Sequence, residues 1–385
     1  MTKRLKHLLL ATLEDPYDVR SWSGIPFNMR VALEKKVDRL TVISRLKPKR
    51  TPVNVALRVA LGARRWPLYL TAAAQAQFAK ETLHAIDTFR PDAMLTISSH
   101  CMVGMDGPPP IPSFMFTDAP WIAWKETYRE FESLPLLGNR FARLEAKAAE
   151  RYTGLIFSSA WAMREAQRLY GAPASKLYSF PMGAGWVPDL DRRQIIAHIE
   201  NRPSDQLDLL FVGRDWMRKG GPLAVEVATT LKAVGVPNVC LHVVGCEPEI
   251  PLEAREVVRV HGFLSAKDVK QSETLKNLFL KSHFMIVPTQ AECFGLVFAE
   301  AQAFGLPTIS RRVQAVPSIV LDDETGILES ADAPAQRYVE RILGVIQDRQ
   351  HYNQIAIAAR DRFENLLNWD KFAESVVEAI TRDLS

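Results

Sequence analysis

One stretch in the last third of the chain, residues 284–310, constrains the fold class more than any other. It opens with an apolar run, Phe284 to Val287, which has the length of a buried parallel strand. After a short polar loop, helix-forming residues run from position 295 to 304, and Gly305 ends the helix. A second apolar run, Thr308 to Ser310, follows at once. This strand–loop–helix–strand order predicts an α/β fold whose loop lies at the carboxyl end of a strand, where open parallel sheets bind ligands.

Two carboxylates bracket the predicted helix. Glu292 precedes it and Glu300 lies more than a turn inside it. The backbone N–H groups of Phe294, Gly295 and Leu296 fall in the first turn, where they suit a phosphate or a sugar hydroxyl, and Gly295 allows close approach of a ligand. A second interpretation stays open at this point. Glu292 would then only complement the helix dipole, and Glu300 would be a solvated surface acid.

A second loop carries two cations. The apolar run 207–212 predicts a strand, and a helix begins near Pro222. Between them lie Arg214, Lys219 and a Gly-Gly pair. A planar guanidinium and a mobile ammonium beside a helix N-terminus suit a diphosphate. The alternative is a basic turn without a ligand.

The first part of the chain also predicts a Rossmann-like unit. A strand from His7 to Leu13, a loop, an amphipathic helix and a second strand, Leu40 to Ile43, follow one another, although Gly-x-Gly-x-x-Gly is absent. Gly24 precedes the helix, either to approach a ligand or only to end a turn. The apolar run near the N-terminus, Leu8 to Leu13, is too short for a signal peptide core.

A third candidate site follows the predicted strand 113–117. Asp118 stands at the carboxyl end of this strand, where a side chain can face a ligand, or can serve as the N-cap of the next helix. His100 follows another predicted strand, 93–97, and is a weaker candidate because a lone histidine after a strand is more often structural.

These motifs together resemble retaining glycosyltransferases of family 4, which have the GT-B fold. The resemblance rests on Glu292-x7-Glu300, on Arg214 and Lys219, and on Trp-Ser-Gly-Ile-Pro at 22–26. Two further segments, 156–161 and 176–183, resemble the end of the family's N-terminal domain.

The resemblance implies roles for individual residues. Glu292 would contact the donor sugar, Glu300 the nucleotide ribose, and the amides of Phe294, Gly295 and Leu296 the sugar and phosphate. Arg214, Lys219 and Gly24 would hold the donor diphosphate, and the backbone at Gly262 and Phe263 would lie against the nucleobase. Asp118 stands where the family often has a histidine near the reacting sugar, which leaves its role open. The loop 311–317 lacks the family's glycines, so no role is carried onto it.

The GT-B resemblance also implies a domain plan of two Rossmann-like domains facing a central cleft. We predict an N-terminal acceptor-side domain at 1–186, a linker at 187–206 and a nucleotide-sugar-binding domain at 207–366. The last helix, 367–385, is expected to cross back onto the N-terminal domain through Trp369 and Phe372.

The implied function is a retaining, metal-independent transfer of a hexose-type sugar from a nucleotide-diphosphate sugar to an acceptor. No cofactor is expected, since the nucleotide sugar is a substrate. Three alternatives remain: a nucleotide-sugar epimerase, a phosphorylase, for which no pyridoxal lysine is evident, and a non-catalytic sugar-nucleotide-binding protein. The base, the sugar and the acceptor are not specified by the residues.

Charge is unevenly distributed along the chain. Residues 1–70 contain 15 basic and 5 acidic residues, a formal charge of +10, whereas the remainder carries 33 and 39, or −6. With Arg64, Arg65 and neighbouring aromatic residues, this predicts a cytoplasmic protein whose basic segment contacts an anionic membrane at its inner face, or receives an anionic acceptor. A lipid-linked or cell-envelope glycan is the acceptor that fits this best. The alternative is a solvated basic face. No nucleic-acid motif accompanies the charge. The four cysteines predict reduced, largely buried thiols rather than a structural metal site.

Overall fold

The computed structural model describes residues 5–49, 52–61, 66–128 and 135–384. Arg64 and Arg65, which the sequence places in the predicted membrane-facing segment, lie outside these residues. The chain divides into two units. The first comprises Met1–Met182 together with Trp369–Ser385, and the second comprises Gly183–Asn368.

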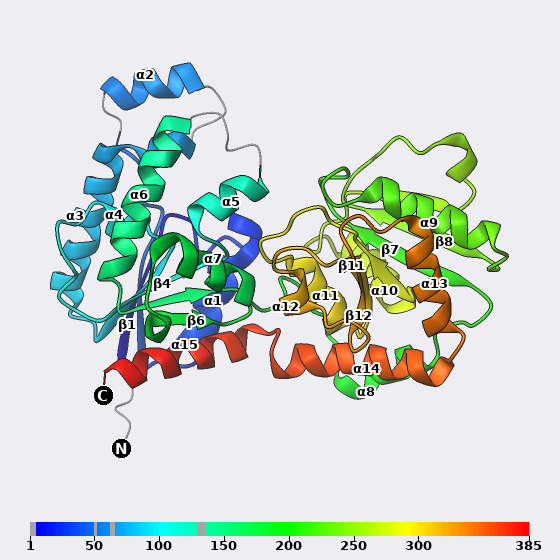
Figure 1. Cartoon of the computed structure of the whole chain (residues 1–385). Coiled ribbons are helices and arrows are strands. Elements are labelled where there is room, and N and C mark those ends of the chain that lie inside the picture. The colour runs from blue at the N-terminus through cyan, green and yellow to red at the C-terminus, as the bar shows by residue number, and fades with distance from the viewer. Residues whose placement is uncertain (1–4, 50–51, 62–65, 129–134, 385) are drawn as a thin grey trace. The chain divides into compact units, whose positions relative to one another are not determined.

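The first unit contains a six-stranded parallel sheet of order β2-β1-β3-β4-β5-β6 (Figure 1). Its strands are β1 (His7–Thr12), β2 (Arg39–Ile43), β3 (Ala93–Ile97), β4 (Ser113–Thr117), β5 (Gly154–Phe157) and β6 (Leu177–Ser179). The central strands are buried on both faces because helices cover both, which explains their continuous apolar runs. The helices are α1 (Ile25–Glu34), α2 (Pro52–Leu61), α3 (Ala72–Phe89), α4 (His100–Val103), α5 (Trp121–Thr127), α6 (Pro135–Arg151) and α7 (Ala160–Tyr170).

The last helix of the chain, α15 (Trp369–Asp383), returns to the first unit and packs against α1 (Figure 1). Phe372 is buried, and its ring meets that of Phe116 on β4 edge to face at a centroid distance of 5.0 Å. Trp369 contacts Phe372 in turn at 5.4 Å. The predicted return of the C-terminal helix through these two aromatic residues is confirmed.

The second unit repeats the same architecture. Its parallel sheet has the order β12-β11-β10-β7-β8-β9. The strands are β7 (Leu207–Val212), β8 (Val239–Val244), β9 (Val258–Gly262), β10 (Phe284–Ile286), β11 (Thr308–Arg311) and β12 (Gly326–Glu329). The helices are α8 (Arg192–Glu200), α9 (Gly221–Ala233), α10 (Val269–Lys281), α11 (Leu296–Ala303), α12 (Val316–Ile319), α13 (Ala335–Ile346) and α14 (Arg349–Asn365). The strand–loop–helix–strand prediction for residues 284–310 is confirmed by β10, α11 and β11.

The division of the chain differs from the predicted one at the linker. Residues 187–206 belong to the second unit, which begins at Gly183. Helix α8 lies within this stretch and packs on α14 and α10. Asp191 and Gln194 form a capping box at its start, since each side chain accepts a hydrogen bond of 2.9 Å from the other's backbone N–H.

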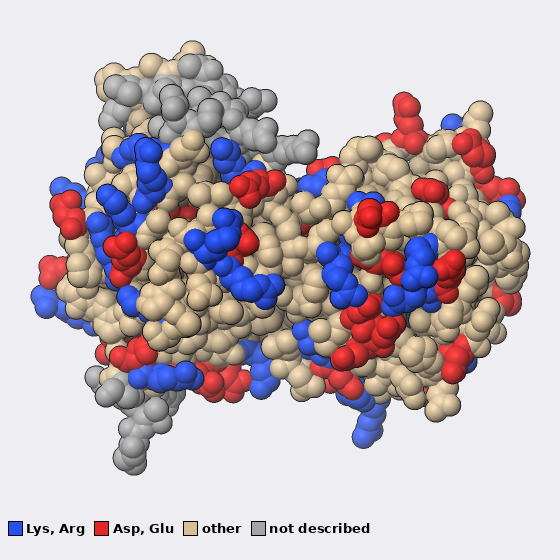
Figure 2. All heavy atoms as spheres, in the orientation of Figure 1, with Lys and Arg blue, Asp and Glu red and all other residues tan. Residues whose placement is uncertain are grey.

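Charged side chains of both signs are interspersed on the face of the molecule that Figure 2 shows. Basic side chains are spread over the first unit on this face, with acidic ones among them. In the described part of the chain, no helix combines the length and the hydropathy needed to cross a membrane.

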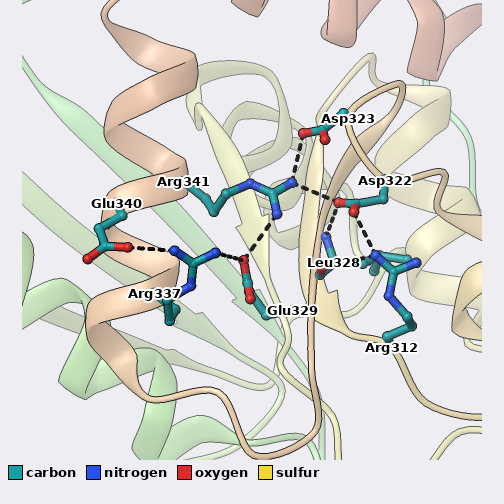
Figure 3. A network of polar contacts seen from close by, with 8 residues as sticks. All are labelled: Arg312, Asp322, Asp323, Leu328, Glu329, Arg337, Glu340 and Arg341. Carbon is teal, nitrogen blue, oxygen red and sulfur yellow. Dashed lines mark hydrogen bonds and ion pairs between the residues drawn. The ribbon is translucent and has the colours of Figure 1, made fainter.

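An ion-pair network secures the edge strand β12 of the second sheet (Figure 3). Arg341 on α13 donates 3.1 Å to Glu329 at the end of β12. The same guanidinium donates 2.9 Å to Asp322 and 2.7 Å to Asp323, in the turn before β12. Arg312 donates to the second oxygen of Asp322 at 2.6 Å. The network joins α13 to both ends of the edge strand, so it stabilises the sheet border rather than a ligand site.

Candidate active site

The second unit presents a row of glycines at the carboxyl edge of its sheet. Gly213, Gly245 and Gly262 follow or end the adjacent strands β7, β8 and β9. The N–H of Gly213 donates to Val244 O at 2.9 Å, and that of Gly245 to Gly262 O at 2.8 Å. A Cβ on Gly245 would stand 2.8 Å from the Gly213 carbonyl. Backbone therefore packs directly against backbone between the ends of β7 and β8.

The loop between β7 and α9 is a tight turn that needs both of its glycines. Gly220 has φ +79°, and a Cβ there would lie 2.1 Å from the carbonyl oxygen of Pro288. A Cβ on Gly221 would meet the ring of Trp216 at 2.2 Å. The turn therefore lies directly against the loop that follows β10.

Two further contacts join these loops. The carbonyl of Arg218 accepts the N–H of Gln290 at 2.8 Å and the hydroxyl of Thr289 at 3.2 Å. Its guanidinium donates to Ala291 O at 2.9 Å and lies 3.5 Å from the Glu292 carboxylate. Arg218, to which the sequence assigned no role, thus fixes the position of Glu292.

Lys219 and Glu292 form a direct ion pair, in which Lys219 Nζ donates to Glu292 Oε2. Both side chains are largely buried, with 12% and 6% of their surface exposed. The backbone N–H of Glu292 donates 2.5 Å to the side-chain oxygen of Gln314. Lys219 and Glu292, which the sequence analysis identified in two different loops, are therefore in direct contact. Gln314 was missed, because the loop that contains it lacks the family's glycines.

The helix after Glu292 begins as predicted. Gly295 has φ +92°, and a Cβ there would stand 2.6 Å from the Phe298 ring and 3.0 Å from Glu292 Cγ. Only glycine fits both the conformation and the space. Leu296 is the first residue of α11, and Phe294 is buried just before it. The N–H groups of this first turn point away from the helix body, so they remain the predicted donors.

Arg214 and Phe263, two donor-site candidates from different loops, lie close together in the same unit. The guanidinium carbon of Arg214 is 5.3 Å from the ring centroid of Phe263, a cation–π distance. The ring of Phe263 is 57% exposed, next to Gly262 with φ +66°. Arg214 and Phe263 thus lie together near the glycine row.

Glu300 lies on α11, and burial raises the pKa of its carboxyl to about 7. The charge of Lys219 and the backbone N–H groups of Trp186 and Gly185 act in the opposite direction. Glu300 therefore faces both the cation of the ion pair and the start of the second unit. This contact with residues 185–186 was not predicted.

The raised pKa gives a stability prediction. An unfolded glutamate has a pKa near 4.5, so between pH 4.5 and 7 the folded protein binds more protons at Glu300 than the unfolded chain does. Stability should then fall as pH rises through this range. We expect the unfolding free energy of Glu300→Gln, relative to that of the parent, to increase as the pH rises from 5 to 8, whatever the difference between them at pH 5. Urea unfolding at pH 5, 6.5 and 8 measures this, and an equal difference at all three values would contradict it.

Gly24 and Asp118 lie in the first unit. Gly24 has φ +80° and is the N-cap of α1, and the preceding Trp22 and Ser23 also have positive φ, 41° and 55°. Non-glycine residues rarely adopt this conformation, which is often found at functional sites. The positive φ values of Gly24 and its two preceding neighbours are compatible with both interpretations of Gly24, close approach of a ligand and a simple turn.

Asp118 is buried at the end of β4, and its carbonyl accepts the Ser158 hydroxyl at 3.1 Å. It is not the N-cap of α5. That position belongs to Pro120, whose own side chain makes no capping hydrogen bond. The first N–H of the helix, that of Trp121, donates instead to Glu145 at 2.9 Å.

A cavity of about 290 Å³ lies at the carboxyl ends of β1, β3 and β4, and we refer to it as the aromatic cavity. Its lining includes the side chains Trp22, His100, Asp118, Trp121, Trp124 and Glu145. Residues of the first unit alone form it. His100 and Asp118, two candidates from separate strands, both reach it, as expected for neighbouring strand ends.

Glu145 was missed because it lies in the middle of a helix. It is 5% exposed and accepts hydrogen bonds from Ser99 Oγ at 2.8 Å and from Tyr170 Oη at 2.6 Å, besides the N–H of Trp121. Burial raises its pKa in spite of these bonds. An acid on the buried face of a helix is the only signal that the sequence offers.

The described residues contain one group with the side chains of a metal site, Asp208, Cys240 and His242. Period-two alternation puts Cys240 and His242 on one face of β8, and Asp208 is the register partner of Cys240 on β7. His242 Nε2 and Asp208 Oδ1 are 3.1 Å apart, and His242 Nδ1 is 3.0 Å from His261 Nε2. This hydrogen-bonded chain accounts for the buried polar groups without an ion.

The prediction of a metal-independent enzyme assumed that no Asp-x-Asp sequence is present, which is wrong, since Asp189 and Asp191 form one. Here Asp191 caps helix α8 through the capping box described above. The pattern therefore has a local structural explanation.

Comparison with known proteins supports this description of the second unit. Residues 192–362 match the model of a family described as glycosyl transferases group 1. Among solved structures, sucrose-phosphate synthase from Thermosynechococcus elongatus superimposes with a TM-score of 0.66 over 97% of this chain and 98% of that one, at 17% identity. The chain has the GT-B fold. WaaG, a glycosyltransferase involved in lipopolysaccharide biosynthesis, gives 0.57 over 98% and 99%, at 16% identity.

The curated relatives found by sequence align with only part of the chain. A D-inositol 3-phosphate glycosyltransferase of Geodermatophilus obscurus is 28% identical over 242 residues, which cover 59% of this chain and 52% of the relative. The corresponding protein of Xylanimonas cellulosilytica is 26% identical over 237 residues, 58% and 55%. The chain therefore spans about half the length of the curated relatives that it matches.

Proposed function

We propose that this protein is a retaining glycosyltransferase that moves a hexose-type sugar from a nucleotide-diphosphate sugar to a hydroxyl acceptor. One observation carries the proposal. Lys219 and Glu292, which the resemblance assigns to the diphosphate and to the sugar, form an ion pair at the carboxyl edge of the second sheet, within the segment that matches the family model. The GT-B fold and the family match support the same class of reaction.

The reaction breaks the bond between the anomeric carbon and the diphosphate oxygen. The acceptor oxygen forms a new bond to that carbon on the same face, its proton passes to the departing diphosphate, and a nucleoside diphosphate is released. The chemical difficulty is the negative charge that accumulates on the leaving group while the sugar becomes cationic. Lys219 and Arg214 would stabilise the diphosphate, and the Glu292 carboxylate would favour the oxocarbenium-like sugar.

Metal independence is part of the proposal. Two cations and the N–H groups at two helix starts can supply the charge stabilisation that a divalent ion supplies elsewhere. Asp191, one residue of the Asp-x-Asp sequence, caps helix α8, which gives it a structural role.

We further propose a lipid-linked or cell-envelope glycan as acceptor and a cytoplasmic location at the inner face of the membrane. The excess of basic residues in positions 1–70 supports this. The structural similarity to WaaG, whose name refers to lipopolysaccharide biosynthesis, is compatible with it.

Thermal unfolding with a panel of UDP-, GDP-, ADP- and dTDP-sugars tests the donor site. A ligand that binds only the folded state raises the melting temperature. We expect one nucleotide class to do so without metal, and to lose its effect in Arg214→Ala. Radiolabelled sugar transfer then tests turnover. A protein that no member of the panel stabilises would not have the proposed site, and stabilisation without turnover would favour a sugar-nucleotide-binding protein.

A further inference from the structure

The aromatic cavity of the first unit contains three tryptophans. Trp121 and Trp124 lie on α5 with ring centroids 5.6 Å apart and planes inclined at 31°, and Trp22 reaches the cavity from the strained loop before α1. Trp121 Nε1 donates to Gly138 O at 3.1 Å, which fixes the orientation of its ring. Trp22 and Trp124 are only half-buried, so part of each ring remains accessible.

Flat aromatic faces beside a few polar side chains suit a pyranose ring. The C–H groups on one face of a sugar are apolar and carry a small positive charge, which matches the negative face of an indole. The hydroxyl groups at the ring edge need hydrogen-bond partners. Asp118 and Ser98 line the same cavity, as does His100, whose Nδ1 is 3.0 Å from Ser98 Oγ.

The ionisable side chains described in the lining of the cavity are mainly acidic. Its lining includes the carboxyl groups of Glu14, Asp118 and Glu145, and neither lysine nor arginine is among its described lining residues. Burial lowers the pKa of His100 to about 4, so this ring is neutral at pH 7. A phosphate in this cavity would meet negative charge with neither lysine nor arginine among the described lining residues, which disfavours it.

We propose that the aromatic cavity binds the acceptor through an uncharged saccharide ring, stacked on tryptophan and hydrogen-bonded to Asp118, and that it rejects phosphorylated rings. This proposal rests on the proposed glycosyl transfer and specifies the acceptor of that reaction. It separates this chain from its matched relatives, whose name includes an inositol phosphate. The proposal also implies that any anionic partner of the basic N-terminal segment binds outside the aromatic cavity.

The test uses the full-length protein without nucleotide, so that it does not depend on the donor site. Tryptophan fluorescence and saturation-transfer NMR measure the binding of neutral methyl glycosides and of myo-inositol. Glucose 6-phosphate and inositol 3-phosphate are the matched anionic probes. We expect at least one neutral saccharide to bind, and the phosphorylated counterpart of each neutral ligand to bind at least tenfold more weakly.

Three variants assign the binding to the cavity. Trp124→Ala should weaken neutral saccharide binding at least tenfold, because it removes a stacking face. Asp118→Asn, which preserves the shape of the side chain, should reduce the discrimination against phosphate. Trp369→Phe removes an indole of the same unit on α15 and should leave binding unchanged.

The outcomes separate this inference from the proposed function. Equal or tighter binding of the phosphorylated probes, or no saccharide binding at all, would overturn the inference even if nucleotides stabilise the protein. Neutral saccharide binding that is lost in Trp124→Ala or shifted by Asp118→Asn supports it. If nucleotides then fail to stabilise the protein, the proposal of sugar transfer is contradicted, whereas the proposal of a saccharide site is retained.

Discussion

Lys219→Ala is expected to reduce kcat for sugar transfer by about 100- to 1000-fold, the range seen when one preorganised charge donor is lost from a transition state. Lys219 is the cation closest to Glu292, and both are held by the loops that follow β7 and β10. Its ammonium is mostly buried, so water cannot replace it without cost. Substrate affinity should change less than kcat, because charge on the diphosphate increases as the bond breaks.

The same substitution has a structural consequence that must be separated from catalysis. It removes the direct ion pair of the buried Glu292 carboxylate, whose contact with Arg218 at 3.5 Å is longer. We expect a loss of about 2 kcal/mol in unfolding free energy, since weakening the pairing of a buried charge is costly. Lys219→Ala combined with Glu292→Gln should regain part of this stability but none of the activity. Lys232→Ala on α9 is the matched control, because it removes an exposed ion pair with Glu256. It should alter neither the stability nor the activity.

A folded Lys219→Ala protein whose kcat stays within threefold of the parent would remove Lys219 from the mechanism. The ion pair with Glu292 would then be a structural contact between two loops. Circular dichroism and the melting temperature establish folding before the rates are compared.

Strands such as β1, β4 and β10 could be predicted because each is a mainly apolar run of buried residues. Parallel strands covered on both faces need no alternation, so a run such as Leu8 to Leu10 identifies a strand from composition alone. Glu292 and Lys219 could be selected for a related reason. Each lies in a loop directly after such a strand, and strand ends of a parallel sheet converge.

The residues that were missed are those whose role depends on distant partners. Arg218 and Gln314 hold Glu292 through contacts across 74 and 22 positions of sequence. Glu145 caps a helix that begins 24 residues before it. No local pattern marks such side chains, because a polar residue in a loop or helix is usually solvated. Gly24 and Gly295 could be identified, since positive φ restricts the choice of residue at a single position.

The prediction of a linker at 187–206 also missed contacts with distant partners, and Arg202 makes several of them. A polar, proline-containing stretch reads as a connection between domains. Arg202 is nevertheless only 3% exposed. Its guanidinium donates to Gly305 O at 3.1 Å, to Leu280 O at 3.3 Å and to Phe304 O at 3.4 Å, and to the hydroxyl of Tyr352 at 2.7 Å. These carbonyls lie at the ends of α10 and α11, where the helix dipoles favour a cation.

Arg202→Met is therefore expected to destabilise the second unit by about 3 kcal/mol, although the position lies in the stretch predicted as a linker. The aliphatic stem is retained, but three carbonyls and a hydroxyl lose a buried charged donor. For a unit of this size the loss corresponds to a fall of about 6–12 °C in melting temperature. Calorimetry measures the transition, and hydrogen exchange of peptides from residues 183–368 assigns it to the second unit.

Arg193→Met is the matched control, because Arg193 is exposed on the first turn of α8 in the same stretch. It should shift the melting temperature by less than about 2 °C, as surface substitutions usually do. Equal, small effects of the two variants would mean that residues 187–206 act as a linker after all. A large effect of Arg202→Met alone requires that this stretch folds with the second unit, since the Arg202 guanidinium then holds the C-terminal ends of α10 and α11.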